Sequence, residues 1–245
     1  MRLDRRLANL GYGSRKDVTK LLKKGHVTDA DGSRLGPSDT DPGGEVRIDG
    51  EPMDPRALTL LLNKPVDLTC SHRDGGATVY GLFPPRYSLR RPPLSTIGRL
   101  DKSTSGLLLL TDDGALLHRI AAPRRAVAKA YRATLARPLP KDAAARLASG
   151  TLMLRSEATP CRPARLEVVT PLSVRLVVTE GRYHLVRRML AALGSHVETL
   201  HRERVGALSL PSDLPPGSWR PATDEEVAAA CASEAPSSDG APSTV

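Results

Sequence analysis

One stretch of the sequence limits the possible fold more than any other, namely residues 98–114, which read GRLDKSTSGLLLLTDDG. It begins as a polar loop, continues as four consecutive leucines, and ends in an acidic turn closed by Gly114. Four consecutive apolar residues between turn signals predict a strand that is buried on both faces. The carboxylate of Asp101 is therefore expected in a loop that leads directly into rigid core, an arrangement that often presents reactive groups.

Two other interpretations of Asp101 compete with a reactive role. An aspartate beside serine and threonine is most often a turn former or a helix cap. A phosphate-binding loop is the second alternative, because Lys102-Ser103 resembles the end of that motif. The motif requires glycine before the lysine, so that backbone amides can approach the phosphate. Here Asp101 takes that place and would repel the anion, which excludes nucleoside triphosphate binding.

The composition predicts a globular protein with an anionic partner. The chain of 245 residues suffices for one large domain or two modest ones, and its 40% hydrophobic content supplies a core. Lys and Arg number 36 against 27 Asp and Glu, a net charge of +9, which favours nucleic acid, although an ordinary basic protein has the same balance. No run suits a membrane span and the start lacks the apolar stretch of a signal peptide, so we expect a cytoplasmic protein.

Metal binding and extended aromatic surfaces are not expected. The three cysteines are far apart and the six histidines are scattered, so the spacing predicts neither a disulfide framework nor a metal site. Aromatic residues make up only 3% of the chain. A multi-aromatic platform for single strands is therefore not expected, and any tyrosine that stacks on a base would do so nearly alone.

The first 55 residues predict a small unit of two helices and short strands. Leu3, Leu7 and Leu10 share one helix face, and Ser14 is placed to cap a second helix that ends at Gly25. Between the apolar positions of the second helix lie five basic residues, Arg15, Lys16, Lys20, Lys23 and Lys24. Such a face is usually only solvated, but this segment resembles an S4-type RNA-binding module, so we expect the five residues to bind RNA.

The rest of the chain predicts an α+β arrangement. The expected elements are a proline-containing linker over 51–58, a buried strand over 58–65, a loop-rich segment over 66–97, a short helix over 115–120, a strand over 127–135, an alanine-rich helix over 141–149, strands over 165–169 and 173–179, and a helix ended by Gly194. The loop-rich segment is either functional or a flexible insertion. From Ala228 onward the residues are small and polar, which predicts a disordered tail.

Three motifs, in order, resemble those of RNA pseudouridine synthases. The first is Gly98-Arg99-Leu100-Asp101 with the leucine strand, the second is the Lys-x-Tyr pattern at 129–131, and the third contains Arg187. An Asn-Lys-Pro triplet at 63–65 and the last strand around Leu200 also match the family pattern. The resemblance covers residues 1–227 and is greatest to the RsuA type, which acts on small-subunit ribosomal RNA, with its large-subunit relatives.

The resemblance implies a role for five residues. Asp101 would be the catalytic residue, paired with a buried Arg187, whose charge would favour the ionised carboxylate. Arg99 would aid base flipping, Tyr131 would stack on the target base, and Leu200 would pack the site. Whether the carboxylate acts as a nucleophile or as the base that removes the C2′ proton remains open at this point.

We therefore expect a fold of class α+β, with an S4-type domain over 1–55, a catalytic domain with a mixed, mostly antiparallel sheet over 56–227, and a disordered tail over 228–245. The expected activity is isomerisation of one uridine in 16S ribosomal RNA to pseudouridine after base flipping, without metal or cofactor. The expected partner is ribosomal RNA in a pre-ribosomal particle, bound by a monomer that does not associate with membranes. The alternatives are a 23S ribosomal RNA enzyme of the same family and a non-catalytic S4-type assembly factor.

Overall fold

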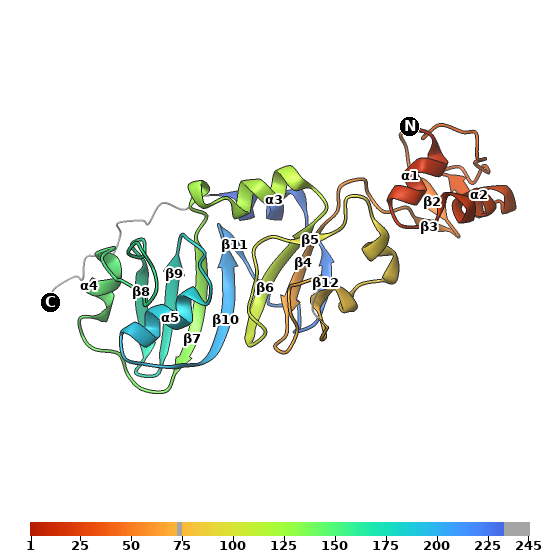
Figure 1. Cartoon of the computed structure of the whole chain (residues 1–245). Coiled ribbons are helices and arrows are strands. Elements are labelled where there is room, and N and C mark those ends of the chain that lie inside the picture. The colour runs from red at the N-terminus through yellow and green to blue at the C-terminus, as the bar shows by residue number, and fades with distance from the viewer. Residues whose placement is uncertain (73–74, 233–245) are drawn as a thin grey trace.

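The computed structural model describes residues 1–72 and 75–232 and contains two separate β-sheets. A three-stranded sheet with two helices forms one end of the molecule, and a nine-stranded sheet runs through the remainder (Figure 1). Each sheet has its own buried cluster of apolar side chains. The fold class α+β predicted from the sequence is confirmed, including a mixed and mostly antiparallel sheet.

The N-terminal unit is built on a small core that its two helices share with the three-stranded sheet. Its elements are α1 (Leu3–Asn9), α2 (Arg15–Lys24), β1 (Val27–Asp29), β2 (Val46–Ile48) and β3 (Glu51–Pro52). Ser14 and Asp17 form a reciprocal capping box at the start of α2, and Gly25 ends the helix in the left-handed conformation, as predicted. The linker predicted over 51–58 is wrong at its start, because residues 51 and 52 pair with β2.

The large sheet has the strand order β12-β4-β6-β10-β7-β9-β8, with β5 paired to β6 and β11 paired to β10. Its strands are β4 (Thr59–Lys64), β5 (Ser95–Thr96), β6 (Thr104–Thr111), β7 (Lys129–Leu135), β8 (Arg165–Thr170), β9 (Ser173–Val178), β10 (Val197–Val205), β11 (Leu208–Ser209) and β12 (Trp219–Pro221). The helices are α3 (Gly114–Ala121), α4 (Ala143–Ala148), α5 (Leu185–Ala192) and α6 (Asp224–Cys231), with 3₁₀ turns at Val79–Leu82, Pro85–Leu89 and Pro123–Arg125. Of the strand pairs, β6 with β10 is parallel and joins two antiparallel halves.

The leucine strand predicted from the sequence lies at the centre of this sheet and is buried on both faces. Leu108 and Leu110 of β6 pack in the larger core, on the side where α5 covers the sheet. Leu107 and Leu109 pack in a second core with α3 and α6 on the opposite side. All four leucine side chains are fully buried, so the loop that precedes β6 is attached to a rigid element.

Gly106 allows β6 and β10 to approach closely at the start of their parallel pairing. Its φ angle of +107° is one that residues with a side chain rarely adopt, and a Cβ atom there would lie 2.3 Å from the carbonyl oxygen of Arg202. The pairing places Gly106 directly opposite Arg202. This close contact brings the loop before β6 next to the residues that β10 carries.

Three parts of the chain differ from the sequence-based expectations. The predicted tail begins too early, because residues 228–231 complete α6 and Ala230 is fully buried in the second core; residues 233–245 lie outside the described part of the chain. The described residues of segment 66–97 are packed rather than free, with Val79, Phe83 and Tyr87 in the larger core. Val127 precedes β7 and packs in the second core, apart from Tyr131.

The N-terminal unit is joined to the large sheet by specific contacts as well as by the chain. The amide of Arg91 donates to the carbonyl oxygen of Asn9 at 2.8 Å, and the amide of Asp54 donates to the Tyr12 hydroxyl at 3.0 Å. The Arg86 guanidinium pairs with the Asp54 carboxylate at 2.9 Å. The contacts of Arg86 and Arg91 involve the segment around residues 84–91, which accordingly forms a structured joint, whereas the bond between Tyr12 and Asp54 lies within the first 55 residues.

Candidate active site

The ammonium group of Lys64, the last residue of β4, donates hydrogen bonds to the backbone of the loop that carries Asp101. Lys64 has no exposed surface. Its Nζ donates to the carbonyl oxygens of Pro65 and Thr104 at 2.9 Å and lies 3.3 Å from that of Asp101 and 3.5 Å from that of Lys102. Burial lowers the pKa of the Lys64 ammonium.

Other groups satisfy the remaining carbonyl oxygens of the same loop. Those of residues 100, 102 and 103 accept from Cys70 Sγ at 3.4 Å, from the amide of Asp67 at 2.8 Å and from Arg187 Nη2 at 3.0 Å, respectively. Every carbonyl from residue 100 to residue 104 therefore has a donor. The backbone that presents the Asp101 carboxylate is fixed before any ligand binds.

Replacement of Lys64 by methionine is expected to reduce both stability and activity. The variant leaves buried carbonyl oxygens without a donor, and each buried acceptor left unpaired costs roughly 1–3 kcal/mol of folding free energy. Activity per folded molecule should fall about 100-fold, because displacement of a reactive group by about 1 Å has an effect of that size. Urea unfolding and initial rates on the same samples measure both quantities. Lys141→Met, at an exposed lysine, is the matched control; full specific activity in Lys64→Met would contradict a positioning role.

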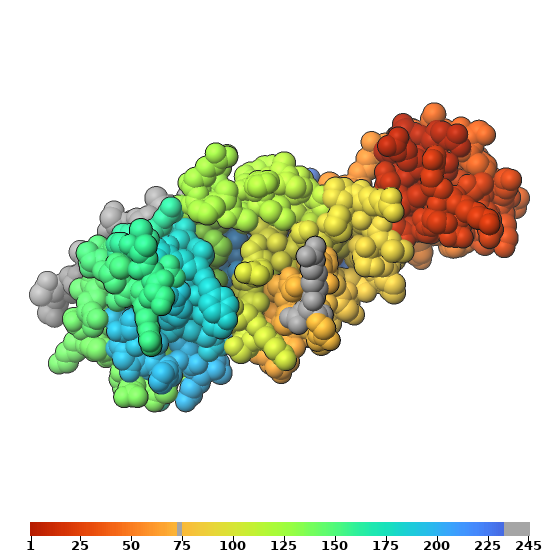
Figure 2. Space-filling model, viewed as in Figure 1, coloured from red at the N-terminus to blue at the C-terminus, as the bar shows by residue number. Residues whose placement is uncertain are grey.

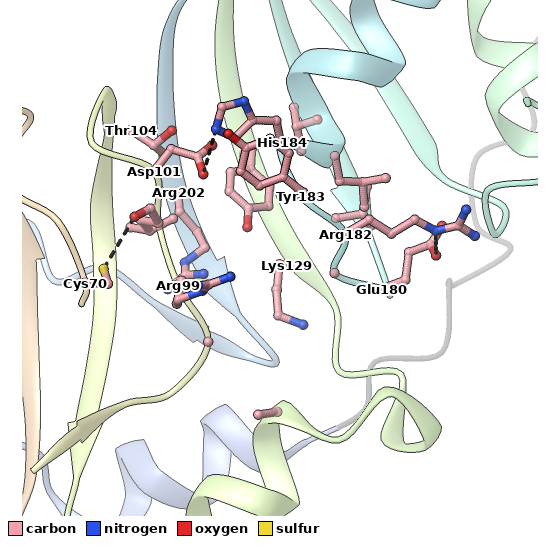
Figure 3. A pocket seen from close by; sticks show the side chains of 18 of the residues that line it. Cys70, Arg99, Asp101, Thr104, Lys129, Glu180, Arg182, Tyr183, His184 and Arg202 are labelled. Carbon is pink, nitrogen blue, oxygen red and sulfur yellow. Dashed lines mark hydrogen bonds and ion pairs between the residues drawn. The ribbon is translucent and has the colours of Figure 1, made fainter. Parts of the chain in front are cut away.

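The Asp101 side chain faces His184, which the sequence did not point to. His184 Nε2 lies 3.4 Å from Asp101 Oδ1, and the two side chains are 38% and 31% exposed (Figure 3). His184 precedes α5 and adopts a left-handed conformation with φ of +50°. Histidine is one of the few residue types found there with some frequency, often at functional sites.

The predicted ion pair between Arg187 and Asp101 is wrong for this structure. The Arg187 guanidinium is half-buried and donates to the carbonyl oxygens of Val197, at 2.9 Å, and Ser103, at 3.0 Å. Arg187 is therefore bound to the backbone of the Asp101 loop and of β10, and within residues 1–72 and 75–232 the His184 ring is the side chain that faces the carboxylate. Arg187 contributes to the site by positioning the Asp101 loop from the α5 side.

Asp101 and His184 lie in a pocket of about 620 Å³ between the two halves of the sheet. Figure 2 shows a hollow between the segment near residues 100–120 and that near residues 180–200. Arg99, Tyr131 and Leu200, all predicted from the sequence, line this pocket, and so does Arg187. Tyr131 and Leu200 are buried in the wall, whereas Arg99 is exposed. The volume lies within the roughly 300–1,000 Å³ that is typical of small-ligand pockets.

The pocket has a positive lining that suits a phosphate-bearing ligand. Six of its lining residues are Lys or Arg, against the two carboxylates Asp101 and Glu180. Among the six, Arg202 is 1% exposed and donates through Nε to the carbonyl oxygen of Leu107 at 2.7 Å. Burial and, secondarily, the charge of Arg202 lower the pKa of Lys129 to about 8.

The pKa of Lys129 predicts a rise in stability between neutral and alkaline pH. From pH 8 to about 10.5 the folded protein has lost this proton and the unfolded chain has kept it, so the unfolded state binds more protons and the free energy of unfolding rises with pH. In Lys129→Met this increment should disappear. Urea unfolding at pH 7 and pH 9.5 gives the change in free energy of unfolding for the original protein and for Lys129→Met. Titrating groups that both proteins share contribute equally, so the difference between the two changes belongs to Lys129. An equal pH response in the two proteins would contradict the assignment.

The five basic residues predicted to bind RNA lie on α2 of the N-terminal unit, outside this pocket. All five side chains are exposed, while Val18 and Leu22 of the same helix are buried. The Arg15 guanidinium lies 3.5 Å from the Asp4 carboxylate, and the Arg15 side chain stays exposed in this contact. The predicted residues therefore divide into two groups, one that lines the pocket and one on a separate helix.

The described residues lack the features of a metal centre and of a membrane-spanning segment. Residues 1–72 and 75–232 contain no group of three or more His, Cys, Asp or Glu side chains that could hold a metal ion. No described helix is long and apolar enough to cross a membrane.

Sequence reasoning missed two residues of the site, His184 and the loop-binding Lys64. Both lie within or beside motifs that match the family pattern, and this position is the sequence signal that could have identified them.

Comparisons with known proteins agree on one family. A family model for RNA pseudouridylate synthase matches residues 59–192. The chain is 41% identical to ribosomal small subunit pseudouridine synthase A of Yersinia pestis over 236 residues, which cover 93% of this chain and 97% of the relative. It is 42% identical to the protein of that name from Escherichia coli (strain K12) over 237 residues, 93% and 99% of the two chains. A crystal structure of a pseudouridylate synthase matches with a TM-score of 0.67 and 36% identity, covering 94% of this chain and 99% of the other.

Proposed function

The chain belongs to the RNA pseudouridylate synthase family, and we propose that it converts one uridine of small-subunit ribosomal RNA to pseudouridine, with Asp101 as the catalytic residue. The observation that carries the proposal is the Asp101 carboxylate in a pocket that six Lys and Arg residues line, on a loop whose carbonyl oxygens from residue 100 to residue 104 all have donors. The substrate class comes from the relatives, whose names refer to the ribosomal small subunit and which match nearly the full length of this chain.

The proposed reaction requires a carboxylate beside the ribose and room for a base to rotate. The bond between C1′ and N1 of the uracil breaks, the base turns, and a bond forms between C1′ and C5. C5 then loses its proton and N1 takes one up, so the product has the same atoms as the substrate. Asp101 acts on C1′ as a nucleophile or on the C2′ proton as a base, and both actions require the ionised carboxylate. Deuterium at C2′ separates the two, because a primary isotope effect arises only where that C–H bond breaks.

The neighbouring residues support the proposed roles by their positions. A target base inside a folded RNA must leave its stack to reach the Asp101 loop. The exposed Arg99 lies at the pocket two residues from Asp101, where it can occupy the space that the base leaves. Tyr131 and Leu200 form part of the apolar wall against which a base can rest. The basic lining neutralises the phosphates on either side.

A map of pseudouridines in ribosomal RNA tests the proposed function. Ribosomal RNA from a strain that lacks this protein should lose one pseudouridine from the small-subunit RNA, and the purified protein should restore it on precursor RNA. Loss of a large-subunit pseudouridine instead would favour the 23S alternative. An unchanged map would favour the non-catalytic assembly factor. Because ribosomal RNA is the substrate under this proposal, we also propose that the protein acts in the cytoplasm on a pre-ribosomal particle. We propose further that it acts as a monomer.

Substitutions of Tyr131 are expected to separate base support from proton movement. Tyr131→Leu removes the ring and should weaken RNA binding about 5- to 150-fold, since base–aromatic stacking contributes roughly 1–3 kcal/mol. Tyr131→Phe keeps the ring, so binding should persist, and turnover should fall steeply if the hydroxyl takes part in proton movement. Melting temperatures of both variants provide the control, because Tyr131 is also a buried core residue. A lowered melting temperature with full activity per folded molecule would leave Tyr131 a structural residue only.

A further inference from the structure

An exposed aromatic pair stands at the mouth of the pocket, and the proposed chemistry does not use it. Tyr183 lines the pocket and is 73% exposed. Its ring stacks on that of His184, with centroids 3.9 Å apart and an angle of 15° between the planes. The chain has one tryptophan, one phenylalanine and five tyrosines. Tyr183 is the exposed one among these seven residues, and the other six are buried or half-buried.

The segment that carries this pair is fixed to the rest of the domain on both sides. The preceding Arg182 donates to the carbonyl oxygens of Thr159 and Pro160 at 2.9 and 2.7 Å, and to the Glu180 carboxylate at 2.8 Å. On the other side, Arg188 donates to the carbonyl oxygen of Tyr183 at 3.2 Å. These contacts hold the backbone around Tyr183, and the stacking on His184 orients its exposed ring. Exposed aromatic surface on a held backbone is characteristic of recognition sites.

We propose that the Tyr183–His184 pair is a stacking platform for an unpaired RNA base next to the uridine held in the pocket. A base has a flat face that a tyrosine ring accepts without regard to sequence, and the nearby cations suit the phosphates that link the two nucleotides. The ligand class rests on the proposed function, because that function is the reason for taking RNA as the ligand.

The geometry assigns the platform to a neighbouring base and not to the reacting one. His184 meets Asp101 through Nε2, at the edge of its ring, while its face is covered by Tyr183. The free face of Tyr183 is turned away from His184, so a base stacked there lies two ring spacings from the His184 plane. The reacting ribose must come within about 3–3.5 Å of the Asp101 carboxylate. We therefore assign the base on Tyr183 to the nucleotide next to the reacting one.

Two eight-nucleotide probes test the platform by fluorescence anisotropy, namely labelled octauridylate and an abasic octamer with the same ribose-phosphate backbone. Tyr183→Ala should bind octauridylate about tenfold more weakly than the original protein, within the five- to 150-fold range of base stacking. Its affinity for the abasic octamer should not change, since that probe offers phosphates and no base. Tyr183→Phe should bind both probes as the original protein does. Leu172→Ala, at a 44% exposed leucine on a distant turn, is the control.

A second background separates the neighbouring base from the reacting base. The Tyr183→Ala effect on octauridylate should persist in a Tyr131→Leu protein, because residues that contact different bases have additive effects. Unchanged octauridylate affinity in Tyr183→Ala, an equal loss with the abasic probe, or disappearance of the effect in the Tyr131→Leu background would each overturn the proposal. The assay requires no pseudouridine formation, so a chain without isomerase activity can still show the platform, and an active chain can lack it.

Discussion

Asp101→Asn is expected to abolish pseudouridine formation, lowering the rate by at least about 10⁴-fold, the scale on which enzymes lose activity when a reactive side chain is removed. The amide is nearly the same size, so the loop should keep its hydrogen bonds, which all involve the backbone. RNA affinity should be equal or higher, because a negative charge disappears from a basic pocket. Rates are measured on small-subunit precursor RNA and affinities on the same RNA.

Two control variants separate the effect of the amide exchange itself from the effect of the carboxylate's position. Asp142→Asn makes the same chemical change at an exposed aspartate and should leave activity unchanged. Asp101→Glu keeps the charge but moves it by one methylene on a fixed loop, and should also lose most activity, because the loop cannot shift to compensate. Turnover by Asp101→Asn above the level of a mock preparation would remove Asp101 from the catalytic role.

Removal of residues 1–55 is expected to weaken RNA binding by at least about 100-fold at low salt and to flatten its salt dependence. Each phosphate contact contributes about 0.7–0.9 to the slope of log affinity against log salt, so loss of all five basic residues of α2 should reduce the slope by roughly 3–5. Deletion also removes Tyr12 and Asp54 from the joint with residues 84–91, and for that reason a folding control is necessary.

A charge variant gives the cleaner form of this experiment. Exchange of Lys16, Lys20, Lys23 and Lys24 for glutamine leaves Val18 and Leu22 in the small core and should preserve the fold. Exchange of Lys141 and Arg146 for glutamine, at two exposed positions beside or in α4, is the control for loss of charge elsewhere on the chain. An unchanged salt slope in the α2 variant would mean that the basic face is only solvated. The S4-type identity of this unit would then lose its main support.

Sequence reasoning identified the family and the fold class because those depend on local patterns. The leucine run specified a doubly buried strand, and the motif around Asp101 fixed its place at the strand's start. The partner of Asp101 was beyond such reasoning. His184 reaches the carboxylate because β6 and β10 pair in parallel across Gly106, and because His184 itself takes a left-handed conformation before α5. Neither condition is visible as a periodic pattern.

The misplaced start of the tail and the wrong partner of Arg187 have the same kind of cause. The end of α6 was assigned to a disordered tail because its alanines resemble the low-complexity residues that follow. Burial of Ala230 depends on contact with the strands, and its carbonyl oxygen lies 2.6 Å from the position that a Cβ on Gly206 would occupy. The predicted Arg187–Asp101 pair failed because the guanidinium finds backbone acceptors first. Tertiary contacts decided each case.

The bound carbonyl groups of residues 100–104 have a consequence for the thermodynamics of each turnover. Ordering a loop residue costs about 1–2 kcal/mol of conformational entropy, and here that loss occurs once, when the chain folds around Lys64. Reaching the transition state then requires no further ordering of the loop, so its activation entropy stays free of this term. A variant with a loosened loop would bind RNA as tightly and yet show a more negative activation entropy, visible as a lower intercept of ln(kcat/T) against 1/T at an unchanged slope.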